Sequence, residues 1–216
     1  DDIMSQHATI ETKHGSASVD PYTSKNVEKI PLAQKMQDLN DFLSNMKIGM
    51  LTTQESEGEL LVSRCMALAG RENDGTDLIF HANLSSGKIS DLSIHPKQVN
   101  ISFLNPSNGG WASIAGEATV LSDRDIIDKY YSTALKAWLG DLGDGVHDGS
   151  RTDPRIGVIK LTAKTATHTV VDKGAIGRTY DMAKGLFTGE VPAFNSVREL
   201  SPQELDKWRE AHRKAE

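Results

Sequence analysis

Short segments rich in β-forming residues, separated by turn residues, fill the chain from residue 47 to residue 121. The strongest turn signal is Asn105-Pro106-Ser107-Asn108-Gly109-Gly110, which predicts that the segments on either side of it form an antiparallel hairpin. Five strands within about 75 residues, joined mostly by tight loops, favour a barrel. The strands are expected at Lys47–Thr53, Leu60–Ala69, Asp77–Ala82, Gln98–Leu104 and Trp111–Leu121.

Two amphipathic segments predict helices that flank these strands. Apolar residues recur at spacings of four and three from Leu32 to Met46, which places one apolar stripe on a helix that begins near Glu28 and covers the sheet. A second helix is expected from about Asp123 to Leu139, because its isoleucine, tyrosine, leucine and tryptophan side chains also form one face.

The last third of the chain is less regular. Arg155–Leu161 and Thr165–Val171 are expected to supply a sixth and a seventh strand. Before them, residues 140–154 form a long loop rich in glycine and aspartate, and loops of that length are usually functional or mobile. Ser201-Pro202-Gln203-Glu204 is a capping box with proline at the first helical position, which predicts a C-terminal helix. Residues 174–192 show no pattern that assigns them.

One folded domain with two extensions fits the length and the composition. The 216 residues contain no segment that resembles a linker between two cores. Residues 1–26 carry too few large apolar side chains to order themselves, so we expect a flexible tail. A domain is therefore expected at residues 27–200, followed by the helical segment 201–216.

Charge and composition argue against several classes of protein. The 24 Lys and Arg residues against 30 Asp and Glu residues give a net charge of −6, so the basic footprint of a nucleic-acid-binding protein is missing. The single cysteine, Cys65, allows no intrachain disulfide, and on a buried strand we expect an inert core thiol. The histidines are scattered without the spacing of a metal site. With no apolar run long enough for a membrane span and no signal pattern, we expect a soluble, cytoplasmic protein without membrane or nucleic-acid partners.

The segment Asp77–Leu104 predicts an anion site. It reads as a strand, a turn with the sequence Asn-Leu-Ser-Ser-Gly-Lys, a short helix that ends at His95-Pro96, and a second strand. A turn of this kind at a helix start presents free backbone N–H groups, hydroxyls and the positive end of the helix dipole, and Lys88 adds a full charge. The phosphate of a cofactor is one expected occupant, and a purely structural turn is the alternative. The segment matches neither the phosphate-binding GxxxxGK[ST] pattern nor GxGxxG.

Arg64 is a second candidate for the same anion. It lies within the otherwise apolar segment LLVSRCMALA, where a charge is costly unless it is paired or reaches solvent at the rim of the barrel. Alternation places it on the strand face opposite to Cys65. Together with Lys88, it could neutralise a dianionic phosphate, and the alternative is an arginine that points to solvent.

These motifs occur together in one known family. The run FHANLSSGK resembles the phosphate signature of the pyridoxamine 5'-phosphate oxidase-like FMN-binding split barrels, and the segments around it, GMLTT, SRCMAL, VNISFLNP and WASIAGEATVL, occur in the family's order. DPYTSK, AWLGDLGDGVHDG, TDPRIGVIKL and GAIGRTYDMAKGLFTGE resemble the branch that holds general stress proteins and fungal blue-light-inducible proteins. The resemblance covers about residues 20–200. It implies a mainly β (α+β) fold, a six- to seven-stranded antiparallel split barrel with flanking helices.

The resemblance also implies a cofactor site, namely FMN held at the interface of a homodimer. The phosphate would be bound by the residues that match Arg64, Ser86 and Lys88. Contacts with the ring and the ribityl chain are implied for Cys65, Met66, His81, Ala82 and either Trp111 or Ser113, and Trp138 would come from the second subunit. The chain departs from the family at Ala82, where the signature has threonine, at Gly87, where oxidases often have a second cation, and at His168 and Thr169, where relatives have a Tyr-Trp pair.

Three functions remain open at this point. The first is an FMN-dependent oxidoreductase that passes electrons from a reduced nicotinamide to a small acceptor, with the cofactor carrying the chemistry. The second is an FMN carrier or sensor without turnover, in a stress or light response. The third is a dimeric interaction module that has lost the cofactor. Pyridoxamine phosphate oxidation itself is not expected, because no arginine-rich substrate motif follows Val191.

Overall fold

The structure is a computed structural model that describes residues 29–171, 188 and 196–212. The expected N-terminal tail, and all of the segment 174–192 except Thr188, lie outside the described residues. The elements, in chain order, are α2 (Leu32–Ser44), β1 (Ile48–Gln54), β2 (Leu61–Glu72), η1 (Asn73–Gly75), β3 (Asp77–Asn83), α3 (Gly87–Ile94), β4 (Val99–Leu104), β5 (Trp111–Leu121), α4 (Arg124–Tyr130), α5 (Ala134–Leu139), β6 (Ile156–Val170), β7 (Ser196–Leu200) and α7 (Pro202–His212).

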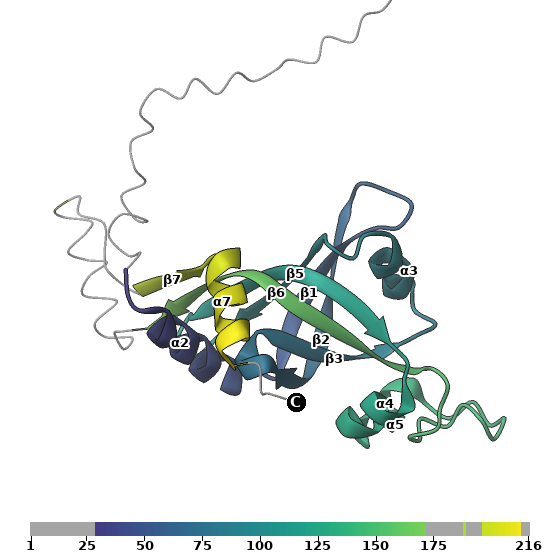
Figure 1. Cartoon of the computed structure of the whole chain (residues 1–216). Coiled ribbons are helices and arrows are strands. Elements are labelled where there is room, and N and C mark those ends of the chain that lie inside the picture. Colours follow the sequence, from purple (N-terminus) through teal and green to yellow (C-terminus); the bar gives the residue numbers. More distant parts are fainter. Residues whose placement is uncertain (1–28, 172–187, 189–195, 213–216) are drawn as a thin grey trace, which may run out of the picture.

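The described strands form one antiparallel sheet that closes into a barrel (Figure 1). Their order is β3-β2-β1-β4-β5-β6-β7, and additional pairing between β3 and β6 closes the first six strands, with β7 added at the far end of β6. The predicted fold class, an antiparallel barrel with flanking helices, is therefore confirmed. In Figure 1, α2 and α7 lie near one end of the barrel, and α3 lies near the other.

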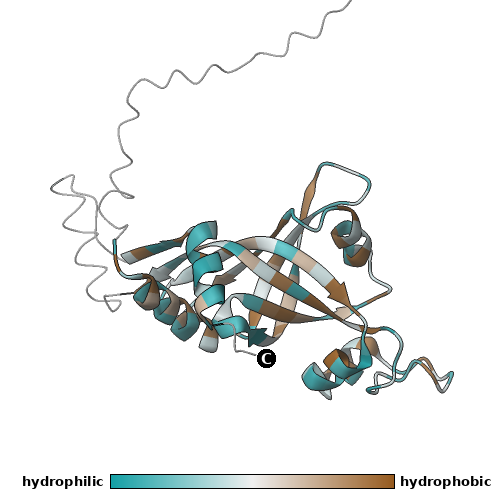
Figure 2. Ribbon diagram, in the orientation of Figure 1, coloured by the Kyte–Doolittle hydropathy of each residue, from teal (hydrophilic) through white to brown (hydrophobic). Residues whose placement is uncertain are grey.

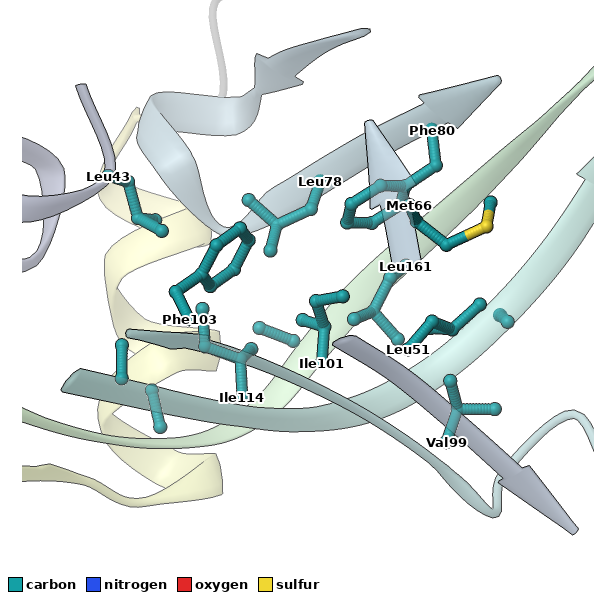
Figure 3. Close-up of a cluster of buried hydrophobic side chains, with 14 of the residues drawn as sticks. Leu43, Leu51, Met66, Leu78, Phe80, Val99, Ile101, Phe103, Ile114 and Leu161 are labelled. Atoms are coloured by element: carbon teal, nitrogen blue, oxygen red, sulfur yellow. The ribbon is translucent and has the colours of Figure 1, made fainter. Parts of the chain in front are cut away.

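The strands make a barrel because apolar side chains alternate along them and gather on its inside. Figure 3 shows Leu51, Met66 and Ile101 converging there from three strands, with Phe80 above them. Leu39 of α2 and Leu205 of α7 belong to the same buried cluster, so both helices are packed on the barrel. In Figure 2, most of α7 carries the hydrophilic colour, and the strands carry most of the hydrophobic colour. A second buried cluster lies under α4 and α5 and consists of Ile79, Ile127, Leu135, Ile156 and Val158.

The prediction of two strands between Arg155 and Val171 is wrong, because β6 runs without a break from Ile156 to Val170. Its neighbour β5 keeps pairing with it through a register shift between Ala115 and Gly116. The shift is possible because residue 116 has no side chain: a Cβ there would lie 2.1 Å from the Thr162 carbonyl oxygen. The seventh strand is instead β7, which adds to the second half of β6.

The prediction of one helix over Asp123–Leu139 is also wrong, since the structure has two short helices there, α4 and α5. Tyr131 takes an extended conformation with φ −55° and ψ 136°, which ends α4. The Ser132 hydroxyl then accepts a hydrogen bond from the backbone N–H of Ala134. Serine and threonine side chains compete with helical hydrogen bonds in this way, so Ser132-Thr133 starts a new helix and interrupts the old one.

Neighbouring strands of the barrel are not hydrogen-bonded to each other along their whole length. Strand β2 pairs with β3 only up to Leu68 and Phe80, and beyond that point residues 61–67 of β2 pair with β1 alone. Residues 81–83 of β3 pair with β6 on the other side. The chain leaves β3 at this divergence, turns, and begins α3, whose Leu92 is buried in the main core. Helix α3 thus brings the expected anion turn next to the unpaired part of β2.

Candidate functional site

The turn from β3 into α3 is built by its own polar side chains. The Asn83 side-chain oxygen accepts the backbone N–H of Ser85, and the Asn83 carbonyl accepts the Ser86 hydroxyl at 2.6 Å. Ser86 is the N-cap residue but makes no side-chain cap, so it does not block the first N–H groups of α3. A Cβ added at Gly87 would meet no atom within 4 Å. The start of α3 is therefore open space with backbone donors beside it.

Lys88 is the positive charge at this helix start. Its Nζ donates to the Ser86 hydroxyl oxygen at 2.7 Å, and no carboxylate pairs with it in the described part of the chain. Burial lowers the pKa of Lys88, and the charge of Arg64 lowers it further. Arg64 is bonded to Asp91, one helical turn after Lys88 on α3, so the two cations lie near each other. A second cation held beside a half-buried lysine favours an anion between or next to them.

Arg64 does not point freely to solvent. Its Nη1 donates to the Thr53 hydroxyl oxygen at 2.6 Å, and its Nη2 donates to Asp91 Oδ2 at 3.0 Å. Asp91 also accepts the Thr53 hydroxyl and the backbone N–H of Ser56. Burial alone would raise the pKa of Asp91, but these hydrogen bonds and the charge of Arg64 lower it below its usual range, so the carboxylate is charged.

Three of the predicted site residues therefore come together, namely Arg64, Ser86 and Lys88. Sequence reasoning missed two others, Thr53 and Asp91, which hold the arginine. Asp91 lies three residues after Lys88 on the same helix, and such spacing suggests a pair between those two residues. The structure instead pairs Asp91 with a strand residue 27 positions earlier in the chain, and no local pattern signals that contact.

The expected inert core thiol at Cys65 is wrong, because the Cys65 side chain is exposed. Alternation along β2 turns Arg64 and Met66 to the inside, so Cys65 faces outward. On the same outward face, Ile48 and Met50 of β1 are 58% and 43% exposed, and Leu104 of β4 is 65% exposed. Trp111 and Ser113 lie on the outward face of β5, next to β4. This outward apolar face, Ile48, Met50, Cys65, Leu104 and Trp111, has no cover within the described chain.

The other predicted residues are more scattered. Met66 and Ala82 are buried in the barrel core, so only their backbone could contact a ligand. The His81 side chain is held at 2.6 Å from Tyr130 O, toward α4. Trp138 of α5 is 84% exposed, and its role at a second subunit stays a prediction.

The loop at residues 140–154 is held by its aspartates. Asp144 accepts the backbone N–H groups of Val146 and His147, and Asp153 accepts that of Gly149. Asp153 is fully buried and forms an ion pair of 2.6 Å with Arg155, which lowers the pKa of Asp153 well below its usual range. The aspartates of this loop are thus engaged in turns, in the Asp153–Arg155 ion pair and in a contact of 2.6 Å between Asp144 and the His147 ring.

The two positions where relatives have a Tyr-Trp pair are buried. Thr169 accepts the backbone N–H of Trp111 at 2.9 Å. His168 has no exposed surface, and neither of its ring nitrogens has a hydrogen-bond partner among the described residues. Burial lowers the pKa of the His168 imidazole to about 4.

None of the helices within the described ranges is both long and apolar enough to pass through a bilayer. No group of three or more His, Cys, Asp and Glu side chains is placed to hold a metal ion in that part of the chain.

The barrel fits one family of proteins. The family model described as pyridoxamine 5'-phosphate oxidase like matches residues 34–193. The chain belongs to the pyridoxamine 5'-phosphate oxidase-like family. Within the curated proteins it is similar to Protein bli-3 of Neurospora crassa, with 46% identity over 199 residues, which cover 92% of this chain and 95% of that protein. The family resemblance inferred from the motifs is therefore confirmed.

Solved structures share the fold at low sequence identity. A candidate general stress protein 26 from Jannaschia sp. CCS1 has a TM-score of 0.59 and 19% identity, covering 78% of this chain and 99% of that one. General Stress Protein 26 from Bacillus anthracis str. Sterne has a TM-score of 0.51 and 19% identity, covering 62% and 92%. A heme binding protein from Mycobacterium smegmatis has a TM-score of 0.51 and 10% identity, covering 84% and 62%. At these identities the likeness shows the fold.

Proposed function

We propose that this chain binds FMN, with the phosphate at Arg64, Ser86 and Lys88, and that a homodimer of it transfers electrons between small molecules. The observation that carries the proposal is the pair of neighbouring cations at the open start of α3. Only one carboxylate, Asp91, offsets them in the described chain, and it pairs with Arg64 alone.

The number of donors favours a phosphate. Arginine has five N–H groups and lysine three, and the described contacts use two on Arg64 and one on Lys88. The remaining donors, with the first N–H groups of α3, exceed what the two oxygens of a carboxylate could accept. A phosphate monoester has three terminal oxygens and two charges, so it matches this set.

Membership of the family supports FMN as the molecule that carries this phosphate, because the matching residues bind the FMN phosphate in the proteins that the motif resembles. Bound FMN would supply the redox chemistry. The residues of this chain would then have simpler tasks: Arg64 and Lys88 anchor the phosphate, and the strands beside them fix the orientation of the ring.

A second copy of the chain would complete the site. The outward apolar face exposes Ile48, Met50 and Leu104 side by side on paired strands β1 and β4. Contiguous exposed apolar surface of this kind marks an interaction site in water-soluble proteins. Cys65 and either Trp111 or Ser113, which the family resemblance assigns to the ring and the ribityl chain, lie on the same face, so a dimer formed there would hold the ring between the two copies.

Flavin titration of a Lys88 variant tests the proposal. Lys88→Ala should weaken FMN binding by about 1.5–3 kcal/mol, the value of a charge-assisted hydrogen bond, which is roughly 10- to 150-fold in Kd. Riboflavin lacks the phosphate, so its Kd should be the same for both proteins. Lys97→Ala is the matched control, because this exposed lysine lies beyond the other end of α3.

The result that overturns the proposal is equal FMN affinity in the wild type and in Lys88→Ala, or a wild type that binds neither flavin. Electron transfer has its own readout. Loss of the flavin absorbance on adding a reduced nicotinamide, followed by its recovery on adding an acceptor, supports an oxidoreductase. A bound flavin that no donor reduces leaves the carrier or sensor function in its place.

A further inference from the structure

One side of the Arg64 guanidinium forms an ion pair within the chain, and its partner is the Asp91 carboxylate. We infer that Asp91 is a positioning residue, which fixes Arg64 relative to Lys88 so that both cations meet one phosphate; this inference rests on the proposed function. Asp91 is only 6% exposed, and both of its oxygens are used by donors of this chain. It is therefore placed to act on Arg64 and not directly on a ligand.

The contacts of Asp91 join three parts of the chain at the place where the barrel is unpaired. The carboxylate lies on α3, and its partners are Thr53 of β1, Ser56 of the turn after β1, and Arg64 of β2. Lys88 lies on the same helix as Asp91, one turn earlier. Since α3 and β2 share no ladder of backbone hydrogen bonds, the Asp91–Arg64 ion pair of 3.0 Å is the link that sets how far Arg64 lies from Lys88.

The negative charge of Asp91 has a second effect on the site. Arg64 lowers the pKa of Lys88, which means that the two cations repel each other when no anion lies between them. Without Asp91, the Arg64 side chain, which is 25% accessible, would relieve the repulsion by turning its guanidinium to solvent. The buried carboxylate opposes that movement because it is charged and bonded to Nη2. The site is thereby kept assembled before the anion arrives, which lowers the cost of binding.

Thr53 completes the clamp. Its hydroxyl donates to Asp91 Oδ2 at 3.0 Å and accepts from Arg64 Nη1 at 2.6 Å, so the arginine is held at two nitrogens. Residues that orient a group binding a ligand typically change affinity by about 10- to 100-fold when they are removed, as second partners of metal ligands do. We expect Asp91 to fall in this range and Thr53 below it.

The test compares FMN with riboflavin in a double-mutant cycle. Asp91→Asn, which keeps the volume and removes the charge, should weaken FMN binding by about 10- to 100-fold and leave the Kd of riboflavin within about twofold. In an Arg64→Ala background, the same Asp91→Asn change should alter FMN binding by less than about twofold, because the group that Asp91 positions is gone. Asp125→Asn, an exposed carboxylate on α4, is the control for the change in net charge.

The outcomes separate the inference from the proposed function. A wild type that binds FMN no more tightly than riboflavin overturns the proposed function, and the inference falls with it. A phosphate preference that survives Asp91→Asn, or that falls equally in the Arg64→Ala background, overturns the inference alone. If Asp91→Asn does not fold, as judged by circular dichroism, Thr53→Val provides the same comparison and should weaken FMN binding several-fold without changing riboflavin binding.

Discussion

His168 makes the stability of this protein depend on pH between about 4 and 6.5. Its side chain has no exposed surface, and within the part of the chain that the structure describes neither ring nitrogen has a hydrogen-bond partner. Burial lowers its pKa from 6.5 to about 4; the charge of Asp38 on α2 opposes this shift, and that of Arg198 on β7 adds to it. The folded protein therefore holds His168 neutral at any pH above about 4.

The two pKa values of His168, unfolded and folded, determine whether a lower pH stabilises or destabilises the folded protein. In the unfolded chain the imidazole takes up a proton as the pH falls through 6.5, but in the folded protein it does so only near 4. Protons thus favour the unfolded state between these values, and the stability present above pH 6.5 is lost as the pH falls toward 4. With these pKa values, the loss between pH 7 and pH 5 is about 2 kcal/mol. For a domain of this size, that lowers the Tm by about 4–8 °C.

Denaturant unfolding at pH 7 and at pH 5 measures this loss, with the protein concentration held constant because subunit association would also add stability. In His168→Gln, the difference in unfolding free energy between the two pH values should be about 2 kcal/mol smaller than in the wild type. Comparing each variant with itself cancels any constant cost of the substitution. His212→Gln, at the exposed end of α7, should keep the wild-type difference.

The carboxylates with lowered pKa do not disturb this window. The hydrogen bond from Lys129 is the largest of the contacts that lower the pKa of Glu72 to about 2, so its contribution to stability is lost only between about pH 4.5 and 2. If His168→Gln and the wild type lose equal stability from pH 7 to pH 5, His168 is not neutral in the folded protein and the reasoning is refuted.

Two further predictions concern the barrel and its outward face. Gly116→Ala places a Cβ 2.1 Å from the Thr162 carbonyl oxygen and should lower the unfolding free energy by about 1–3 kcal/mol in a urea titration. Gly87→Ala, where a Cβ meets no atom within 4 Å, should cost far less, and equal losses in the two variants would contradict the explanation of the register shift. Met50→Asp should convert the proposed dimer into a monomer in sedimentation experiments, because it places a charge on the outward apolar face. A wild type that sediments as a monomer would exclude a dimer at this face.

Most of the strands of the barrel could be predicted because patterns within each short segment determine them. Alternating apolar residues and turn signals placed β1 to β5 within a few residues of their bounds, and the apolar stripe from Leu32 placed α2. The errors arose where contacts between distant segments decide the structure. The continuity of β6 depends in this way on a glycine in the neighbouring strand β5. The break before α5 is a different error, because it comes from a local contact of the Ser132 hydroxyl that the apolar periodicity does not report.

The residues of the candidate site likewise divide into those that local sequence predicts and those that depend on contacts between distant segments. Ser86 and Lys88 belong to one turn, and their sequence context was enough to propose an anion site. Arg64 was assigned because a charge in an apolar strand needs a partner. The identity of that partner was not predictable, since Thr53 meets Arg64 through the pairing of β1 with β2, and Asp91 reaches it only when α3 packs beside β1. Cys65 was misplaced because an apolar strand was taken to be buried on both faces, whereas its outward face is open.

The departures from the family signature have unequal consequences in this structure. Ala82 is buried in the barrel core at 6% exposure. Replacing the family's threonine by alanine therefore changes the packing of the core and leaves the hydrogen-bond donors at the start of α3 unchanged. Gly87 is different, because its Cβ position borders open space beside the anion turn and a cation there would have added charge to the site. Without a cation at position 87, that part of the site offers only backbone N–H groups, and a larger share of the binding falls to Arg64 and Lys88. A chain with two cations where oxidases often have three depends more strongly on how those two are positioned, which is the task that Asp91 performs.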